Sequence, residues 1–168
     1  MPASETALLA SLCVCVGSAA LIDARTRRIP NEISLATAIG GVTLAVTGVS
    51  GVSILSSLAG LALGFALMLP GHVLGATGGG DVKLFAAAGA LLGAGRIVPA
   101  FLLTAIAGGV FALAVAWWRG RLTRTLTNTA RLCGRSSQVR EAIESPAEHN
   151  RFPYGGAIAV GCVLAVLM

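Results

Sequence analysis

Two aspartates are the residues of this sequence best suited to chemistry, because the chain contains no others. Asp23 ends the first apolar segment, and Asp81 follows a run of three glycines, 78–80, and opens another apolar segment. Two carboxyl groups held close together resist simultaneous ionisation, so one keeps a proton while the other stays charged. Such a pair can activate a water with the charged member and assist a carbonyl or a leaving amine with the neutral one. Gly78 and Gly80 suit such a site because glycine allows close backbone approach, so we expect them to position the loop or an extended peptide.

The composition predicts that these aspartates lie in a membrane protein. The 168 residues are 55% hydrophobic and only 11% charged, and their mean hydropathy is +0.85. Soluble domains carry about 25% charged residues, whereas long apolar runs that recur along a chain are typical of polytopic helical membrane proteins. We therefore expect an all-α fold in a single membrane-embedded domain over residues 1–168.

The positive net charge of +5 has two interpretations. A basic chain can bind nucleic acid, but in a membrane protein the excess more often reflects arginine-rich cytoplasmic loops next to anionic lipid. The second interpretation is favoured, so we expect membrane lipid as a partner and no nucleic acid. The four cysteines and two histidines lack the spacing of a metal site, so no metal and no cofactor is expected.

Apolar runs and their interruptions predict a six-transmembrane-helix bundle. Pro30 and Asn31 separate the first two runs, with Asn31 as a helix N-cap, and Pro70 is expected to end the third. Arg96 and Pro99 separate a short fourth run from the fifth. A basic cytoplasmic loop, 119–151, is expected between helices five and six. The predicted spans are about 3–22, 33–49, 54–69, 82–95, 97–118 and 154–168.

The distribution of lysine and arginine predicts the orientation of these spans. If the N-terminus faces outside and six spans alternate, eleven basic residues face the cytoplasm and only Arg96 faces outside. That asymmetry follows the positive-inside rule. It places Asp23 and Asp81 on the same, cytoplasmic, face, so we expect the two carboxylates to meet there.

Three segments of the sequence resemble a known family. The pattern Gly78-x-Gly80-Asp81 resembles the GxGD signature of type IV prepilin peptidases, and Asp23 before an Ile-Pro-Asn triplet at 29–31 resembles that family's other aspartate segment. Residues 151–158 resemble its C-terminal Pro-Tyr-Gly element, here Pro153, Tyr154 and Gly155. The three matches occur in the family's order and span most of the chain.

The resemblance implies an aspartic endopeptidase with Asp23 and Asp81 as its catalytic pair. Its substrate would be a pilin-like precursor whose basic leader peptide is removed at the cytoplasmic face of the bacterial inner membrane. Pro153, Tyr154 and Gly155 are then candidates for substrate positioning. The sequence is similar to the short, peptidase-only form of tight-adherence (Flp-type) pilus systems, so N-methylation is not expected.

Two other functions are compatible with a pair of membrane aspartates. In a small proton-coupled transporter the carboxylates would relay protons, but such proteins show interrupted helices in both halves, and here the glycine-rich break occurs once. A non-catalytic subunit of a pilus or secretion assembly would tolerate the loss of both carboxylates.

Overall fold

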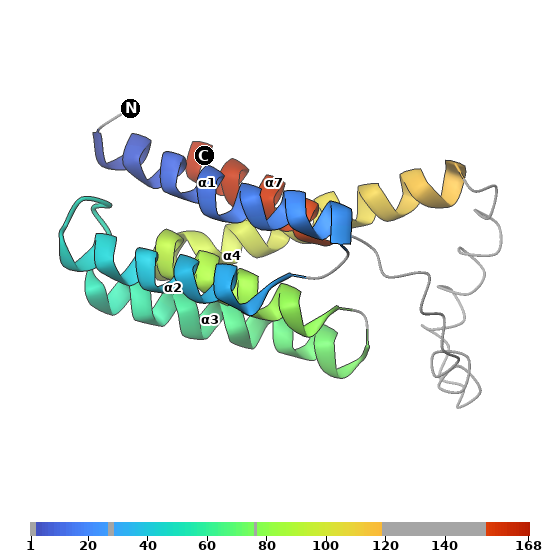
Figure 1. Cartoon of the computed structure of the whole chain (residues 1–168), viewed down its shortest axis with the longest axis horizontal. Coiled ribbons are helices and arrows are strands. Elements are labelled where there is room, and N and C mark those ends of the chain that lie inside the picture. The colour runs from blue at the N-terminus through green and yellow to red at the C-terminus, as the bar shows by residue number, and fades with distance from the viewer. Residues whose placement is uncertain (1–2, 27–28, 76, 119–153) are drawn as a thin grey trace. The chain divides into compact units, whose positions relative to one another are not determined.

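The computed structural model of the protein describes residues 3–26, 29–75, 77–118 and 154–168, and the regular structure in these ranges is helical. Its helices are α1 (Ala3–Thr26), α2 (Asn31–Val46), α3 (Ile54–Val73), α4 (Gly79–Trp118) and α7 (Tyr154–Leu167) (Figure 1). Residues up to Gly108 form one compact unit together with α7, and residues 109–118 of α4 belong to a second unit. All contacts described below lie within the first unit.

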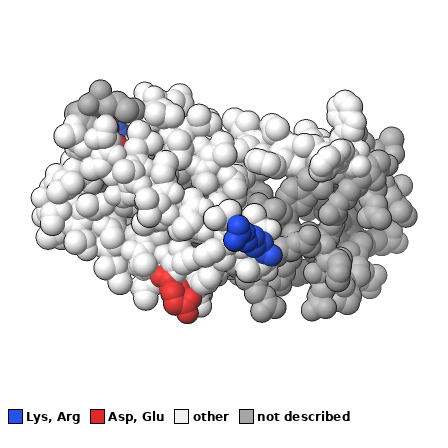
Figure 2. Space-filling view, turned by 45° about the horizontal axis from the view of Figure 1, so that its top comes forward, with Lys and Arg blue, Asp and Glu red and all other residues white. Residues whose placement is uncertain are grey.

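Three of these helices are long and apolar enough to cross a membrane: α1, α3 and the Gly79–Ala114 part of α4. Helices α2 and α7 are also apolar but shorter, with 16 and 14 residues. Many large apolar side chains point outward, including Val14, Leu55 and Val73. On the face shown in Figure 2, the described part of the surface is almost entirely uncharged and carries only a few charged side chains. An all-helical membrane protein is the fold that these features indicate.

Helix α4 covers both the fourth and the fifth predicted span, and the chain reverses direction within it. Gly93 has φ 75° and ψ 172°, a conformation that interrupts the helix and suits glycine. The rings of Phe85 and Phe101 touch edge to face with their centroids 6.0 Å apart, although sixteen residues of straight helix would separate them by about 24 Å. The two segments of α4 therefore fold back on each other at Gly93.

This arrangement changes the expected helix count and one expected boundary. The described residues contain five helices, so a count of six is not confirmed, and the predicted basic loop 119–151 lies outside them. The break falls at Gly93 and not at Arg96 or Pro99. The Ser56 hydroxyl of α3 accepts a hydrogen bond of 3.1 Å from the Ala94 N–H, which satisfies a donor at the start of the second segment.

Three other predicted boundaries also differ from the structure. Helix α1 continues to Thr26, so Asp23 lies inside its last turns. Helix α3 continues through Pro70 to Val73, and the Leu74 N–H donates to the Pro70 carbonyl at 3.0 Å, so the proline does not end the helix. Asn31 is the first residue of α2 and not its N-cap, which is Pro30 without a side-chain cap.

Small residues allow α3 and α4 to pack backbone against backbone. Ser57 and Gly60 lie on one face of α3 and are fully or almost fully buried. The Ser57 hydroxyl donates to the Ala90 carbonyl at 2.7 Å. A Cβ atom on Gly60 would overlap the carbonyl oxygen of Gly89. Such close approach of helices is how membrane proteins gain packing energy without a hydrophobic driving force.

Helices α1 and α7 form a second packed pair, side by side in Figure 1. The buried residues of α1 recur at helical spacing and meet buried residues of α7; the main ones are Leu8, Leu12, Val16, Ala19, Ile158, Cys162 and Ala165. At the N-terminal end of α1, Arg96 forms an ion pair with Glu5 at 3.0 Å. The Gly93 turn therefore lies at that end, and the start of α4 lies at the other.

The contact between Gly60 and Gly89 predicts a large effect for a single added methyl group. Gly60→Ala should lower the free energy of unfolding by about 1–3 kcal/mol, because the neighbour is backbone and cannot rotate away. Unfolding of the purified protein in detergent measures this. Gly40→Ala in α2 is the matched control, because no atom lies within 4 Å of its added Cβ. Equal stability of the two variants would contradict the packing described here.

Candidate active site

Asp23 and Asp81 lie at the same end of the bundle, where α1 ends and where α4 and α7 begin. Both are buried, with 5% and 9% of their surface exposed. They are close enough for the two carboxylates to repel each other electrostatically. The structure thus brings together the two residues that the sequence singled out, from positions 58 residues apart.

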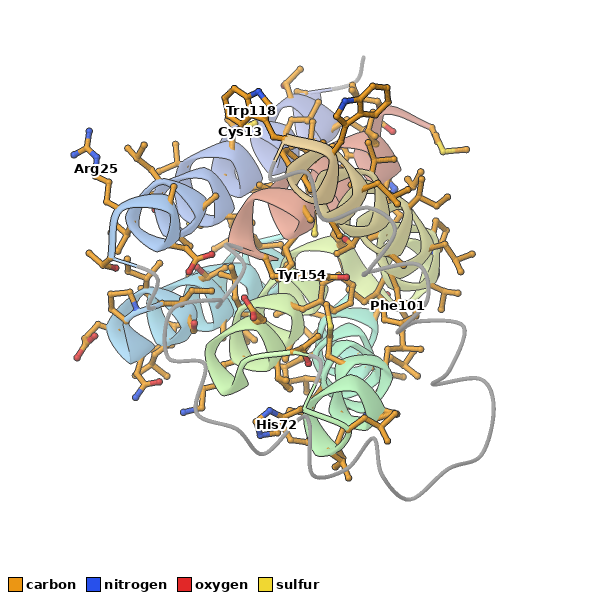
Figure 3. All side chains as sticks on the ribbon, turned by 90° about the vertical axis from the view of Figure 1, so that its right-hand side faces the viewer. Cys13, Arg25, His72, Phe101, Trp118 and Tyr154 are labelled. Carbon is orange, nitrogen blue, oxygen red and sulfur yellow. The ribbon has the colours of Figure 1, made fainter. Side chains whose placement is uncertain are left out.

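Asp23 is held by the first turn of α7. The backbone N–H of Gly155 donates to Asp23 Oδ2 at 3.0 Å, in a buried contact. Only glycine fits well here, because a Cβ on residue 155 would lie 3.0 Å from that oxygen and 3.1 Å from Asp23 Cβ. The nearby Arg25 is exposed and points away from the bundle (Figure 3). A neutral backbone donor therefore contacts the Asp23 carboxylate.

Asp81 is held by the glycine run that precedes it. The Gly78 N–H donates to Asp81 Oδ2 at 3.1 Å, and the Asp81 N–H donates to the Gly78 carbonyl at 3.1 Å. The start of α4 also favours negative charge, because its first N–H groups have no partner within the helix. Gly78 itself is exposed at the surface.

His72 supports this loop from the end of α3, although no sequence pattern singled it out. Its Nδ1 donates to the Thr77 carbonyl oxygen at 3.0 Å. A Cβ on Gly79 would lie 3.5 Å from the imidazole, so the ring packs beside the glycine run. The imidazole thereby links the C-terminal turn of α3 to the turn that carries Asp81 (Figure 3).

The Ile-Pro-Asn triplet packs against the same turn. A Cβ on Gly80 would lie 3.2 Å from Ile29 Cβ, so the missing side chain of Gly80 makes room for Ile29. One turn on, the Lys83 ammonium donates to Asn31 Oδ1 at 3.0 Å. The two sequence patterns that contain the aspartates are therefore in direct contact beside Asp81.

Tyr154, the first residue of α7, lies near the site and packs on the second segment of α4. It is half-buried, near the centre of the end-on view in Figure 3, and it lies within electrostatic range of Asp81. Its hydroxyl packs on Gly108, where an added Cβ would lie 2.6 Å from the phenolic oxygen. The first two residues of α7 therefore relate to different aspartates: Tyr154 to Asp81 and Gly155 to Asp23. Pro153, the third residue of that predicted element, lies outside the described residues.

Other potentially reactive groups lie apart from this site. Among the described residues, no three histidine, cysteine or carboxylate side chains are grouped as metal ligands. Cys13, Cys15 and Cys162 are free thiols. In the described part of the chain, the site thus consists of two carboxylates, each with one backbone N–H donor, and a phenol within electrostatic range of Asp81.

One comparison with known proteins gives a match. A family model described as the type IV leader peptidase family matches residues 10–113, more than half of the chain. The matched range contains both aspartates and the Ile-Pro-Asn triplet, and it ends before Tyr154. None of the curated proteins and none of the solved structures matches the chain.

Proposed function

The chain belongs to the type IV leader peptidase family, and from this premise we propose that it is an aspartic endopeptidase with Asp23 and Asp81 as its catalytic pair. Its substrate is a Flp-like prepilin, from which it removes the leader peptide at the cytoplasmic face of the bacterial inner membrane. No cofactor is needed for this reaction, because the two carboxylates and a water supply its chemistry.

The single observation that carries this proposal is the meeting of two buried carboxylates at one end of an apolar bundle. A carboxylate in a membrane helix is costly and marks a functional site by default. Two of them close together are costlier still, since their charges repel. A purely structural role does not account for that cost, whereas proton exchange with a water and a peptide does.

The proposed reaction uses the two carboxyl groups in different protonation states. The ionised one accepts a proton from a water, whose oxygen attacks the scissile carbonyl, while the protonated one donates its proton to the carbonyl oxygen. This gives a tetrahedral diol, and the roles then reverse. The carboxyl that gained a proton gives it to the leaving amine, the other recovers its proton from the diol hydroxyl, and the C–N bond breaks.

The residues around the two aspartates are suited to hold the carboxylates and the substrate in position. Gly155 and Gly78 each donate one N–H to an aspartate, so a neutral backbone group holds each carboxylate. Tyr154 lies within electrostatic range of Asp81 and Gly78 is exposed, and we assign to both the positioning of the substrate. The same role for Gly80 and Pro153 stays a prediction.

The ends of the helices support the cytoplasmic placement. The site lies at the end of α1 that carries Arg25, and the Glu5–Arg96 ion pair lies at the opposite end. Under the proposed topology, Arg96 is the one basic residue outside, against eleven inside. This orientation would place the leader-cleaving site where basic loops and anionic lipid meet.

Replacing either aspartate should abolish cleavage without preventing membrane insertion. Asp23→Asn and Asp81→Asn keep the shape of the side chain but cannot exchange the proton, so each should lower the rate at least about a thousandfold. Mass spectrometry of a co-expressed Flp-type prepilin locates the cut and measures its extent. Full cleavage by either variant would refute the catalytic pair, and it is the result expected of a non-catalytic pilus subunit. If the protein were a proton-coupled transporter, the wild type would not cleave the prepilin.

The contact between Gly155 and Asp23 predicts a second, milder loss. Gly155→Ala should lower the cleavage rate about tenfold to a hundredfold, because its Cβ would displace the Asp23 carboxylate. Gly156→Ala is the matched control, since no atom lies within 4 Å of its Cβ. Both variants are compared by initial rates at equal amounts of folded protein. Equal rates would show that α7 does not position Asp23.

A further inference from the structure

A groove near the site has a polar mouth and apolar walls. It has a volume of about 450 Å³ and is lined from α2, α3 and α4. The lining residues are Asn31, Glu32, Ser34, Leu35, Ala38, Leu61, Lys83 and Ala87. From Asn31 to Ala38 the groove follows α2 for about 10 Å. Its polar residues lie at the end of the bundle that holds the aspartates, and its apolar residues lie farther along the helices.

The mouth of the groove carries one charge of each sign. Lys83 gives one of its three N–H donors to Asn31 Oδ1, which leaves two for a ligand. The N-terminus of α2 lies at the same mouth and has no side-chain cap, so its first N–H groups are suited to an anion. Glu32, in that first turn, is exposed and adds a carboxylate to the mouth.

Ser34 adds an independent sign of a missing ligand. This residue lines the groove and is only 6% exposed, yet its hydroxyl has no hydrogen-bond partner. A buried hydroxyl without a partner costs free energy. A polar group that enters the groove would satisfy it.

We propose that this groove is a binding site for one zwitterionic phospholipid with a primary amine, of the phosphatidylethanolamine class. The phosphate lies between Lys83 and the first turn of α2, the ammonium pairs with Glu32, and an ester oxygen reaches Ser34. One acyl chain follows Leu35 and Ala38 between the helices. This site is separate from the proposed cleavage of leaders and does not depend on it.

The size and charge of the groove favour this occupant over others. A volume of about 450 Å³ is in the range of small-molecule sites, which suits a headgroup and the first part of one acyl chain, with the rest of the lipid outside the groove. An anionic lipid would satisfy Lys83 but would bring no cation to Glu32. A choline headgroup has a cation but no N–H donors for the carboxylate.

The test is native mass spectrometry of the full chain from nanodiscs with equal parts phosphatidylethanolamine, phosphatidylcholine and phosphatidylglycerol, all with the same acyl chains. We expect one retained lipid, with phosphatidylethanolamine enriched at least about fivefold over phosphatidylcholine. Glu32→Gln should abolish that enrichment while a phospholipid is still retained. Lys83→Met should lower the retention of all three lipids.

A matched pair of variants tests the location. Ala38→Phe fills the groove and should lower lipid retention at least about tenfold, whereas Ala36→Phe, on an exposed position of α2 outside the lining, should not. Equal retention in the pair, a preference for phosphatidylglycerol, or a Glu32→Gln variant that still prefers phosphatidylethanolamine would overturn the proposal. So would an Ala38→Phe variant that binds lipid normally but cleaves prepilin with a raised KM, which would indicate a peptide site. If Ala38→Phe does not fold, the Glu32→Gln result decides.

Discussion

The burial of two carboxylates in an apolar bundle is the constraint on which the rest of this structure depends. A buried carboxylate needs hydrogen-bond donors, and here each receives one from a backbone N–H, of Gly155 or of Gly78. At both glycines an added Cβ would lie 3.0 Å from a carboxylate oxygen, so a side chain at either position would crowd the carboxylate that the backbone holds. The glycines beside the aspartates are therefore required by the charge that they solvate, and a larger residue at either one would displace the carboxylate.

The same need for close approach extends through the bundle to its opposite end. Helices α3 and α4 meet through Ser57, Gly60 and Gly89, so the first segment of α4 is fixed in depth and rotation relative to α3. The turn at Gly93 then sends the second segment back toward the site, where Gly108 receives Tyr154. Because Arg96 is tied to Glu5 at the far end, both ends of α1 contact other elements of the bundle. The positions of Asp23 and Asp81 thus follow from packing over the whole length of the helices.

The sequence was sufficient to predict an all-helical fold with apolar spans and to single out two aspartates that the structure buries, but not several boundaries. Apolar runs and a rare pair of carboxylates are local signals, and both are visible in the residues themselves. The break at Gly93 was missed because Arg96 and Pro99 are stronger local signals. The positive φ of Gly93, and the lack of room there for a side chain next to Ser56 and Val52, are features of the tertiary structure. Asn31 resembles an N-cap in sequence, but the Lys83 ammonium takes its side chain, which only the tertiary structure reveals. The support that His72 gives to the glycine run was missed for the same reason.

The contact between the Ile-Pro-Asn triplet and the glycine run explains why two short patterns so far apart have to occur together. Ile29 fills the space that Gly80 leaves, and Asn31 binds Lys83, so the turn before Asp81 rests on the chain that follows Asp23. Any motion that carries α1 away from α4 would have to separate these contacts as well as the two carboxylates. It would also alter the mouth of the groove, since Asn31 and Lys83 belong to both. A phosphate bound between Lys83 and the first turn of α2 would join the same two elements. Lipid in the groove is therefore expected to stabilise the contact between the start of α2 and the start of α4.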